Sequence, residues 1–158
     1  MSIDEIVKLS QVGHVRFDNM EQALAIYLSA ENRSKGLIYV GANTGQELPI
    51  CKHYADKIYA FEPITNPSVW NQLILHEDYN TYCLNYALTD HNDVMCFHTS
   101  SNNFESSSLF EPQERITEFP DVKFTDIIFV KCRRLDHFHF VQFCDVLIMD
   151  VQGAELSV

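Results

Sequence analysis

The sequence predicts an α/β fold with a mainly parallel sheet, because short apolar segments alternate along the chain with segments of helical periodicity. The strands of such a sheet are covered on both faces, so they are expected to be apolar throughout rather than at every second residue. Six segments of the chain are predicted to be strands on this basis. They are residues 37–40, 57–61, 80–88, 94–98, 127–132 and 146–149.

Helices are predicted before and between these strands. The first precedes Gly36, where five apolar residues recur at the spacing of one helix face and where Asp18 or Asn19 would cap the first turn. The five residues are Met20, Ala23, Leu24, Tyr27 and Leu28. Further helices are predicted at residues 47–55, 70–76 and 138–143.

The composition narrows the classes of function. The chain has a formal net charge of −11, which would repel nucleic-acid phosphates and anionic lipid headgroups, so neither nucleic acid nor a membrane is an expected partner. The N-terminus lacks the basic and apolar segments of a signal peptide, and no apolar run approaches the roughly 20 residues that span a bilayer. We therefore expect a cytoplasmic protein with one α/β domain at residues 36–158, preceded by a helical segment at 1–35.

The cysteines and histidines do not form a metal-binding pattern. The five cysteines are odd in number and no two are spaced as C-x-x-C, so free thiols are expected. Asp136, His137 and His139 come nearest to a ligand cluster, but ligand geometry needs more than two neighbouring histidines, and no metal site is predicted. Three aromatic residues of the same segment are expected in the core. They are Phe138, Phe140 and Phe143.

A glycine loop follows the first predicted strand. Gly41-Ala42-Asn43-Thr44-Gly45 comes directly after residues 37–40, and glycine allows the backbone to turn sharply and to approach a ligand closely. The second predicted strand is followed by Glu62, 21 positions after Gly41 (62 − 41 = 21). An acidic residue about 20 residues beyond such a loop is placed to accept hydrogen bonds from ribose hydroxyls. Together the two features predict a nucleoside site, the alternative being a tight turn beside a surface glutamate.

The loop departs from the pattern of dinucleotide-binding proteins. That pattern, G-x-G-x-x-G, has glycine at its third and sixth positions, where this chain has Asn43 and Gln46. S-adenosylmethionine carries no phosphate and does not need the missing glycines. The departure therefore favours this methyl donor over a nicotinamide cofactor, and a methyltransferase over an oxidoreductase.

Six short blocks of the chain resemble successive motifs of the FkbM family of methyltransferases. Their order and spacing carry the resemblance, which covers most of the chain from Gly36 onward. The blocks are Tyr39–Gly45, Phe61–Pro63, Asn85–Leu88, Ser107–Leu109, Arg134–Asp136 and Met149–Glu155. The resemblance implies a Rossmann-like class I fold and methyl transfer from S-adenosylmethionine to a hydroxyl of a small molecule or a carbohydrate.

The resemblance also implies which residues hold the donor. Glu62 would bind the ribose hydroxyls, and Pro63 would shape the turn after it. Other residues of the matching blocks would line the methionine and ribose side or lie near the adenine. The first group is Gly41, Ala42, Asn43 and Gly45, and the second is Asn85 and Ala87.

Two carboxylates are candidates for catalysis. Asp150 would follow a central strand and face the crevice where ligands bind in open α/β sheets, and it could take the proton of an acceptor hydroxyl or orient the acceptor. The alternative role of Asp150 is a helix N-cap. Glu155 is the second candidate, and the alternative is a first-turn residue that complements the helix dipole. Ser107 and Ser108 would contact the cofactor or the acceptor, or else belong to a plain loop.

Three departures from the family pattern are visible. Tyr39 stands where the family often has Asp, and Gln152 stands where it often has Glu. The chain ends at Val158, before the last strands of a complete sheet of this class, so the strand at 146–149 would be an exposed apolar edge beside the strand at 37–40. We expect a partial methyltransferase domain, or a non-catalytic module that acts through a partner chain, with a homo-oligomer as one way to cover the edge.

Overall fold

Four strands form a parallel sheet in the computed structural model, which describes residues 20–29, 31–109, 122–152 and 154–158. They are β1 (Leu37–Val40), β2 (Ile58–Phe61), β3 (Thr81–Leu84) and β7 (Val146–Met149), in the order β3-β2-β1-β7. Every neighbouring pair is parallel. The predicted α/β fold with a mainly parallel sheet is confirmed, and so is the position of the strand at 146–149 beside the strand at 37–40.

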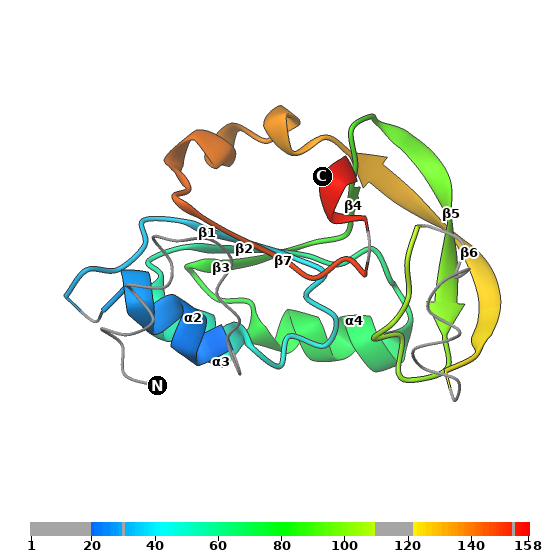
Figure 1. Ribbon diagram of the computed structural model, residues 1–158, viewed down its shortest axis with the longest axis horizontal. Helices are drawn as coiled ribbons and strands as arrows, with labels where there is room; N and C mark the ends of the chain where they lie inside the picture. Colours follow the sequence, from blue (N-terminus) through cyan, green and yellow to red (C-terminus); the bar gives the residue numbers. More distant parts are fainter. Residues whose placement is uncertain (1–19, 30, 110–121, 153) are drawn as a thin grey trace, which may run out of the picture.

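Helices cover one face of this sheet. They are α2 (Met20–Tyr27), α3 (Leu48–Tyr54) and α4 (Pro67–Leu73), which continues into the 3₁₀ turn η1 (Ile74–His76). Figure 1 shows the three helices on the same side of the sheet. Helix α4 begins before residue 70 because Asn66 Oδ1 accepts a hydrogen bond from Ser68 N at 2.9 Å and because Pro67, with its fixed φ, suits the first helical position. The predicted cap residues Asp18 and Asn19 lie outside the described residues.

The main core lies between the sheet and these helices. All four residues of β1 are buried, as predicted for a central strand of a parallel sheet. Leu48 of α3 and Leu73 of α4 are 0% exposed and pack in the same cluster as Leu37 of β1 and Ala60 of β2. Each buried leucine stabilises the fold by roughly 1.5–3 kcal/mol relative to an exposed one.

Aromatic side chains cover the opposite face of the sheet. Two 3₁₀ turns, η2 (Leu135–His137) and η3 (His139–Phe143), lie there (Figure 1). Phe138 packs edge to face against Phe61 with ring centroids 5.1 Å apart, and Phe140 stacks on Tyr59 at 3.7 Å. The short helix predicted at residues 138–143 is present as the 3₁₀ helix η3, which begins at His139. The core position predicted for Phe143 is wrong, since this side chain is 69% exposed while Phe138 and Phe140 fill the space above β2.

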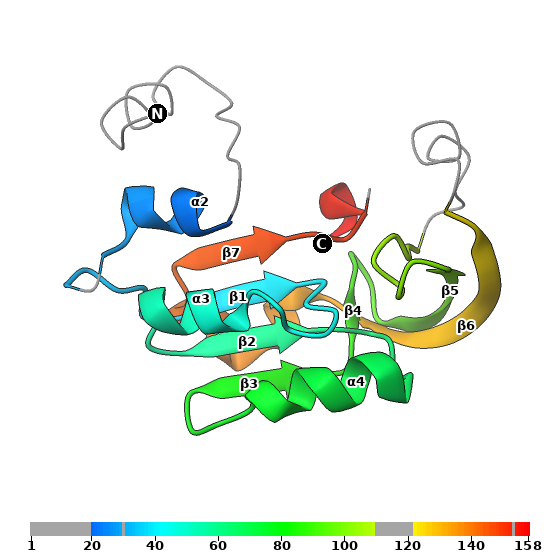
Figure 2. The ribbon, with the colours of Figure 1, turned by 90° about the horizontal axis from the view of Figure 1, so that it is seen from below.

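A second sheet stands at the carboxyl ends of the first one. It consists of β4 (Ala87–Leu88), β5 (Asp93–Ser100) and β6 (Phe124–Arg133) in the order β4-β6-β5, with β5 and β6 antiparallel. Figure 2 shows the β5–β6 ribbon beyond the arrowheads of β1, β2 and β3. The single strand predicted at 80–88 is wrong, because the chain turns between β3 and β4, where Tyr86 N donates to Leu84 O at 3.0 Å. The two halves of that segment belong to different sheets.

Strand β7 is an edge strand within the part of the chain that the structure describes. Val146 and Ile148 pack against the core, whereas Leu147 and Met149 are 46% and 39% exposed. The expected apolar edge is therefore present, and pairing of two copies through it stays a prediction. None of the described helices has the length and the apolar composition that crossing a bilayer requires.

Replacing Phe61 by alanine is expected to lower the free energy of unfolding by about 3–5 kcal/mol, because the ring is fully buried between the sheet and the aromatic side chains of Phe138 and Phe140. Urea denaturation followed by circular dichroism measures the change. Phe143→Ala is the matched control and should cost less than about 1 kcal/mol, because its ring is 69% exposed. Equal losses in the two variants would contradict this description of the core.

Candidate functional site

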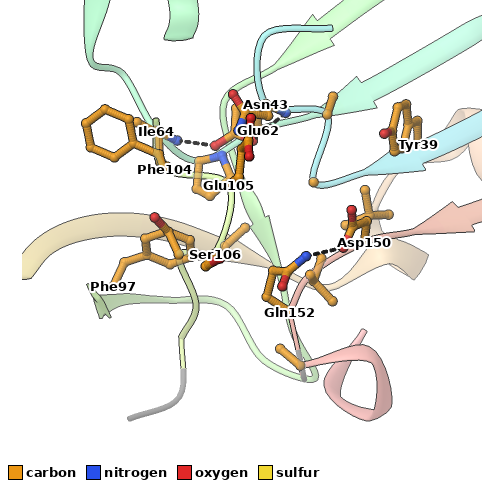
Figure 3. Close-up of a pocket in the computed structure, with 18 of the residues that line it drawn as sticks. Tyr39, Asn43, Glu62, Ile64, Phe97, Phe104, Glu105, Ser106, Asp150 and Gln152 are labelled. Carbon is orange, nitrogen blue, oxygen red and sulfur yellow. Dashed lines mark hydrogen bonds between the residues drawn. The ribbon is translucent and has the colours of Figure 1, made fainter. Parts of the chain in front are cut away.

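A cavity of about 440 Å³ lies at the carboxyl ends of β1, β2 and β7. Ligands of open α/β sheets bind at this edge, because the strand ends and the loops after them meet there. Most of the lining residues come from five segments that lie far apart in the sequence (Figure 3). They are residues 39–44, 62–64, 86–88, 104–107 and 150–152.

The glycine loop closes tightly over the end of β1. Gly41 has φ +82°, and a Cβ at this position would lie 2.0 Å from the carbonyl oxygen of Asp150. Only glycine tolerates both the positive φ and this close approach. Gly45 has φ +80° and donates its N–H to Ala42 O at 2.8 Å, but it faces Leu48 and His76 and does not line the cavity. Of the predicted loop residues, Gly41, Ala42 and Asn43 thus face the cavity, and Gly45 shapes the loop from behind.

Glu62 joins the glycine loop to the turn after β2. The side chain is only 4% exposed, and its carboxylate accepts hydrogen bonds from Asn43 N through Oε2 and from Ile64 N through Oε1, both at 2.8 Å. Burial raises the pKa of Glu62 to about 7, although the bonds from Ile64 N and Asn43 N act in the opposite direction. Each oxygen keeps a second acceptor position, so the carboxylate can still accept hydrogen bonds from a ligand.

Asn85 supports this turn from outside the cavity. Its Nδ2 donates to the carbonyl oxygens of Glu62 and Pro63, both at 3.0 Å. Pro63 and Ala87 line the cavity, whereas Asn85 lines a neighbouring surface groove. The geometry therefore gives Asn85 a positioning role, and it places Pro63 and Ala87 where a ligand could contact them.

Asp150 lies on the cavity wall directly after β7. Its N–H donates to Val40 O at 2.9 Å, which continues the pairing of β7 with β1, and its carboxylate accepts a hydrogen bond from Gln152 Nε2. The N-cap alternative for Asp150 is wrong, because the next turn, η4 (Glu155–Ser157), begins five residues later with Ala154 at its cap position. Glu155 opens this turn, and its side chain lies outside the described part of the structure.

The loop after β5 forms a further wall of the cavity, of which sequence analysis had singled out only Ser107 and Ser108. Phe104 and Glu105 of this loop line the cavity. Ser107 is buried and its Oγ accepts a hydrogen bond from Ser100 N at 3.0 Å, while Ser108 Oγ donates to Gln152 O at 3.1 Å. Both serines therefore hold the loop in place, and Ser107 also lines the cavity, where a ligand could contact it.

Tyr39 and Glu47 form a second pair that the sequence pattern did not reveal. Tyr39 Oη donates to Glu47 Oε2 at 2.7 Å, and the phenol side chain is 3% exposed. The side chain of Tyr39 leaves the sheet towards the start of α3, where Glu47 precedes the first turn. No short-range pattern links a strand residue to a carboxylate eight positions later, so only the fold shows this contact.

The cavity is acidic. Four carboxylate residues line it, and no lysine, arginine or histidine does so among the residues that the structure describes. The four are Glu47, Glu62, Glu105 and Asp150. Such a lining opposes the binding of phosphates and favours a ligand with a positive charge.

Two polar atoms of the glycine loop are buried without a partner. Asn43 Oδ1 and Thr44 Oγ1 have no hydrogen bond within the described structure. Buried polar atoms are normally paired, and leaving one unpaired costs about 1–3 kcal/mol. Both residues line the cavity, so a polar ligand bound there could supply the missing hydrogen bonds.

The side chains that come nearest to a metal-binding pattern in the sequence contact other side chains instead. Asp136 accepts a hydrogen bond from Arg134 NH2 at 2.5 Å, and His137 Nδ1 lies 2.9 Å from Asn92 Nδ2. Across the described ranges, no three His, Cys, Asp or Glu side chains gather as a metal-binding group.

Comparison with known proteins identifies a family. The family model for the methyltransferase FkbM domain matches residues 40–158, from the end of β1 to the last residue of the chain. The match includes the glycine loop, Glu62, Asp150 and the loop after β5. No curated protein and no solved structure matches the chain.

Gly41→Ala is expected to lower the free energy of unfolding by at least about 3 kcal/mol, since the added Cβ would meet the Asp150 carbonyl in a backbone conformation with positive φ. Thermal and urea denaturation measure the change. Gln46→Ala is the control from the same loop, and its exposed side chain predicts a change within about 0.5 kcal/mol. A Gly41→Ala variant as stable as the control would show that β1 and β7 do not approach this closely.

Proposed function

The chain belongs to the FkbM methyltransferase family, and we propose that its cavity binds S-adenosylmethionine for methyl transfer to a hydroxyl of a small molecule or a carbohydrate. The assignment of the donor depends on the position of the Glu62 carboxylate. This carboxylate is buried at the cavity wall and fixed by two backbone N–H groups, and its remaining acceptor positions suit a pair of adjacent hydroxyls such as those of ribose.

The remaining lining fits the same donor. The unpaired Asn43 Oδ1 and Thr44 Oγ1 offer acceptor and hydroxyl groups to the polar parts of the ligand. The hydrophobic side chains of Ile64, Phe97 and Phe104 offer an apolar surface on which a purine ring could lie. A lining with four carboxylates and, among the described residues, no cationic side chain suits a sulfonium ion and disfavours the pyrophosphate of a nicotinamide cofactor.

Asp150 is proposed as the residue that acts on the acceptor. When bound, S-adenosylmethionine would supply an electrophilic methyl group, whose bond to sulfur breaks as the bond to the acceptor oxygen forms, and the acceptor oxygen must then lose its proton. The Asp150 carboxylate lies on the cavity wall, where it could orient the hydroxyl and accept that proton. Glu155 is the second candidate for this role. The enclosing loop after β5 would exclude water and align the acceptor, which are the largest contributions that a protein makes to such a displacement.

Titration with S-adenosylhomocysteine tests the donor site. The chain is expected to bind this thioether with a micromolar Kd, and Glu62→Ala is expected to weaken binding by at least about 100-fold, because two hydrogen bonds to a charged acceptor are lost. Glu31→Ala, at an exposed position, should leave Kd unchanged. Absence of binding to the unmodified chain would reject the donor assignment and favour a non-catalytic module.

The affinity for S-adenosylhomocysteine is expected to rise about tenfold between pH 6 and pH 8, because the ionised Glu62 carboxylate accepts hydroxyl hydrogen bonds and its pKa is about 7. In the absence of ligand, stability should change in the opposite direction. The folded chain binds this proton more tightly than the unfolded chain, whose pKa is near 4.5, so the contribution of Glu62 to stability falls as pH rises from 4.5 through 7. A Glu62→Gln variant should bind weakly and without this pH dependence, and an unchanged pH profile would contradict the role of Glu62.

A further inference from the structure

Two of the four cavity carboxylates gather at one end, beside Tyr39. Glu47 accepts the hydrogen bond of the Tyr39 hydroxyl at 2.7 Å, and both residues line the cavity together with Asp150. Figure 3 shows Tyr39 and Asp150 on one side of the cavity, with Ile64 and Phe104 on the opposite side and Glu62 between them. Tyr39 and Asp150 thus lie at one end of the cavity, away from Ile64 and Phe104.

Burial raises the pKa of the Tyr39 phenol, and the hydrogen bond and negative charge of Glu47 and the charge of Asp150 raise it further, so both carboxylates lie near this hydroxyl. The phenol therefore stays protonated and continues to donate to Glu47, which fixes the direction of that carboxylate. Among the described residues, no lysine, arginine or histidine lines the cavity.

We propose that Glu47, oriented by Tyr39, acts with Asp150 to make this cavity selective for a cationic ligand, so that it binds S-adenosylmethionine more tightly than the neutral S-adenosylhomocysteine. This inference rests on the proposed function and adds to it a specificity-determining residue, Glu47. It also implies that the reaction product competes weakly with the methyl donor. The neutral product gains nothing from the two negative charges.

The two ligands make a controlled comparison. They differ by one methyl group and one positive charge on sulfur, whereas adenine, ribose and the amino-acid end are the same in both. Contacts of Glu62 and the glycine loop therefore contribute equally to the two dissociation constants. A positive charge within several ångströms of two partly shielded carboxylates is expected to give about a tenfold difference in Kd.

Isothermal titration of the full chain with each ligand tests the proposal. The unmodified chain should bind S-adenosylmethionine about tenfold more tightly than S-adenosylhomocysteine, and Glu47→Gln should reduce this ratio to about threefold or less. The Gln side chain can still accept the Tyr39 hydrogen bond, so the fold is expected to survive, and thermal unfolding checks this. Tyr39→Phe keeps both negative charges but releases Glu47, and it should reduce the ratio by a smaller factor.

Glu31→Gln makes the same change in net charge at an exposed position away from the cavity, and it should leave the ratio as it is in the unmodified chain. Binding of both ligands with equal Kd values, or a ratio that Glu47→Gln does not alter, would overturn the selectivity while leaving the donor site in place. Binding of neither ligand would overturn the donor assignment and the selectivity together.

Discussion

The paired hydrogen bonds from Asn43 N and Ile64 N to the Glu62 carboxylate hold the site together. They join the loop after β1 to the turn after β2, and they do so through a side chain that is almost completely buried. Burying a carboxylate is costly unless its oxygens are hydrogen-bonded, so the two loops and the side chain depend on one another. Asn85 extends this arrangement by binding the carbonyl oxygens of Glu62 and Pro63, which fixes the backbone that carries the carboxylate.

The parallel sheet determines where this arrangement can form. The carboxyl ends of β1, β2 and β7 lie at one edge, and the contact of Gly41 with the Asp150 carbonyl leaves no room for a side chain between β1 and β7. The second sheet stands at the same edge and supplies the loop with Phe104 and Glu105. Residues from the two sheets therefore enclose one cavity, although no single segment of the chain contains it.

The negative charge of the cavity is consistent with the methyl donor that we propose for this member of the family. The proposed donor, S-adenosylmethionine, carries a positive sulfur, and a cavity that is lined by four carboxylates and, among the described residues, by no lysine, arginine or histidine suits such a ligand better than a phosphate-bearing one. Tyr39 stands where the family often has Asp. This part of the cavity nevertheless carries a negative charge. The Tyr39 hydroxyl holds Glu47, and the carboxylate of Glu47 is brought to the same wall.

The sequence by itself determined the elements whose signal is local. The strands at 37–40 and 146–149 were predicted to the residue, because each is a short apolar run that ends at a glycine or an aspartate, and the spacing of Gly41 and Glu62 predicted that the two residues share one site, as they share the wall of one cavity. Only the tertiary structure decided how residues distant in the chain pair. In the folded chain, the segment at 80–88 belongs to two sheets, and Tyr39 donates a hydrogen bond to Glu47. Asn85 and Gly45 do not line the cavity. Hydropathy and spacing act within a segment, whereas strand pairing and the partners of buried polar groups depend on which surfaces the folded chain brings together.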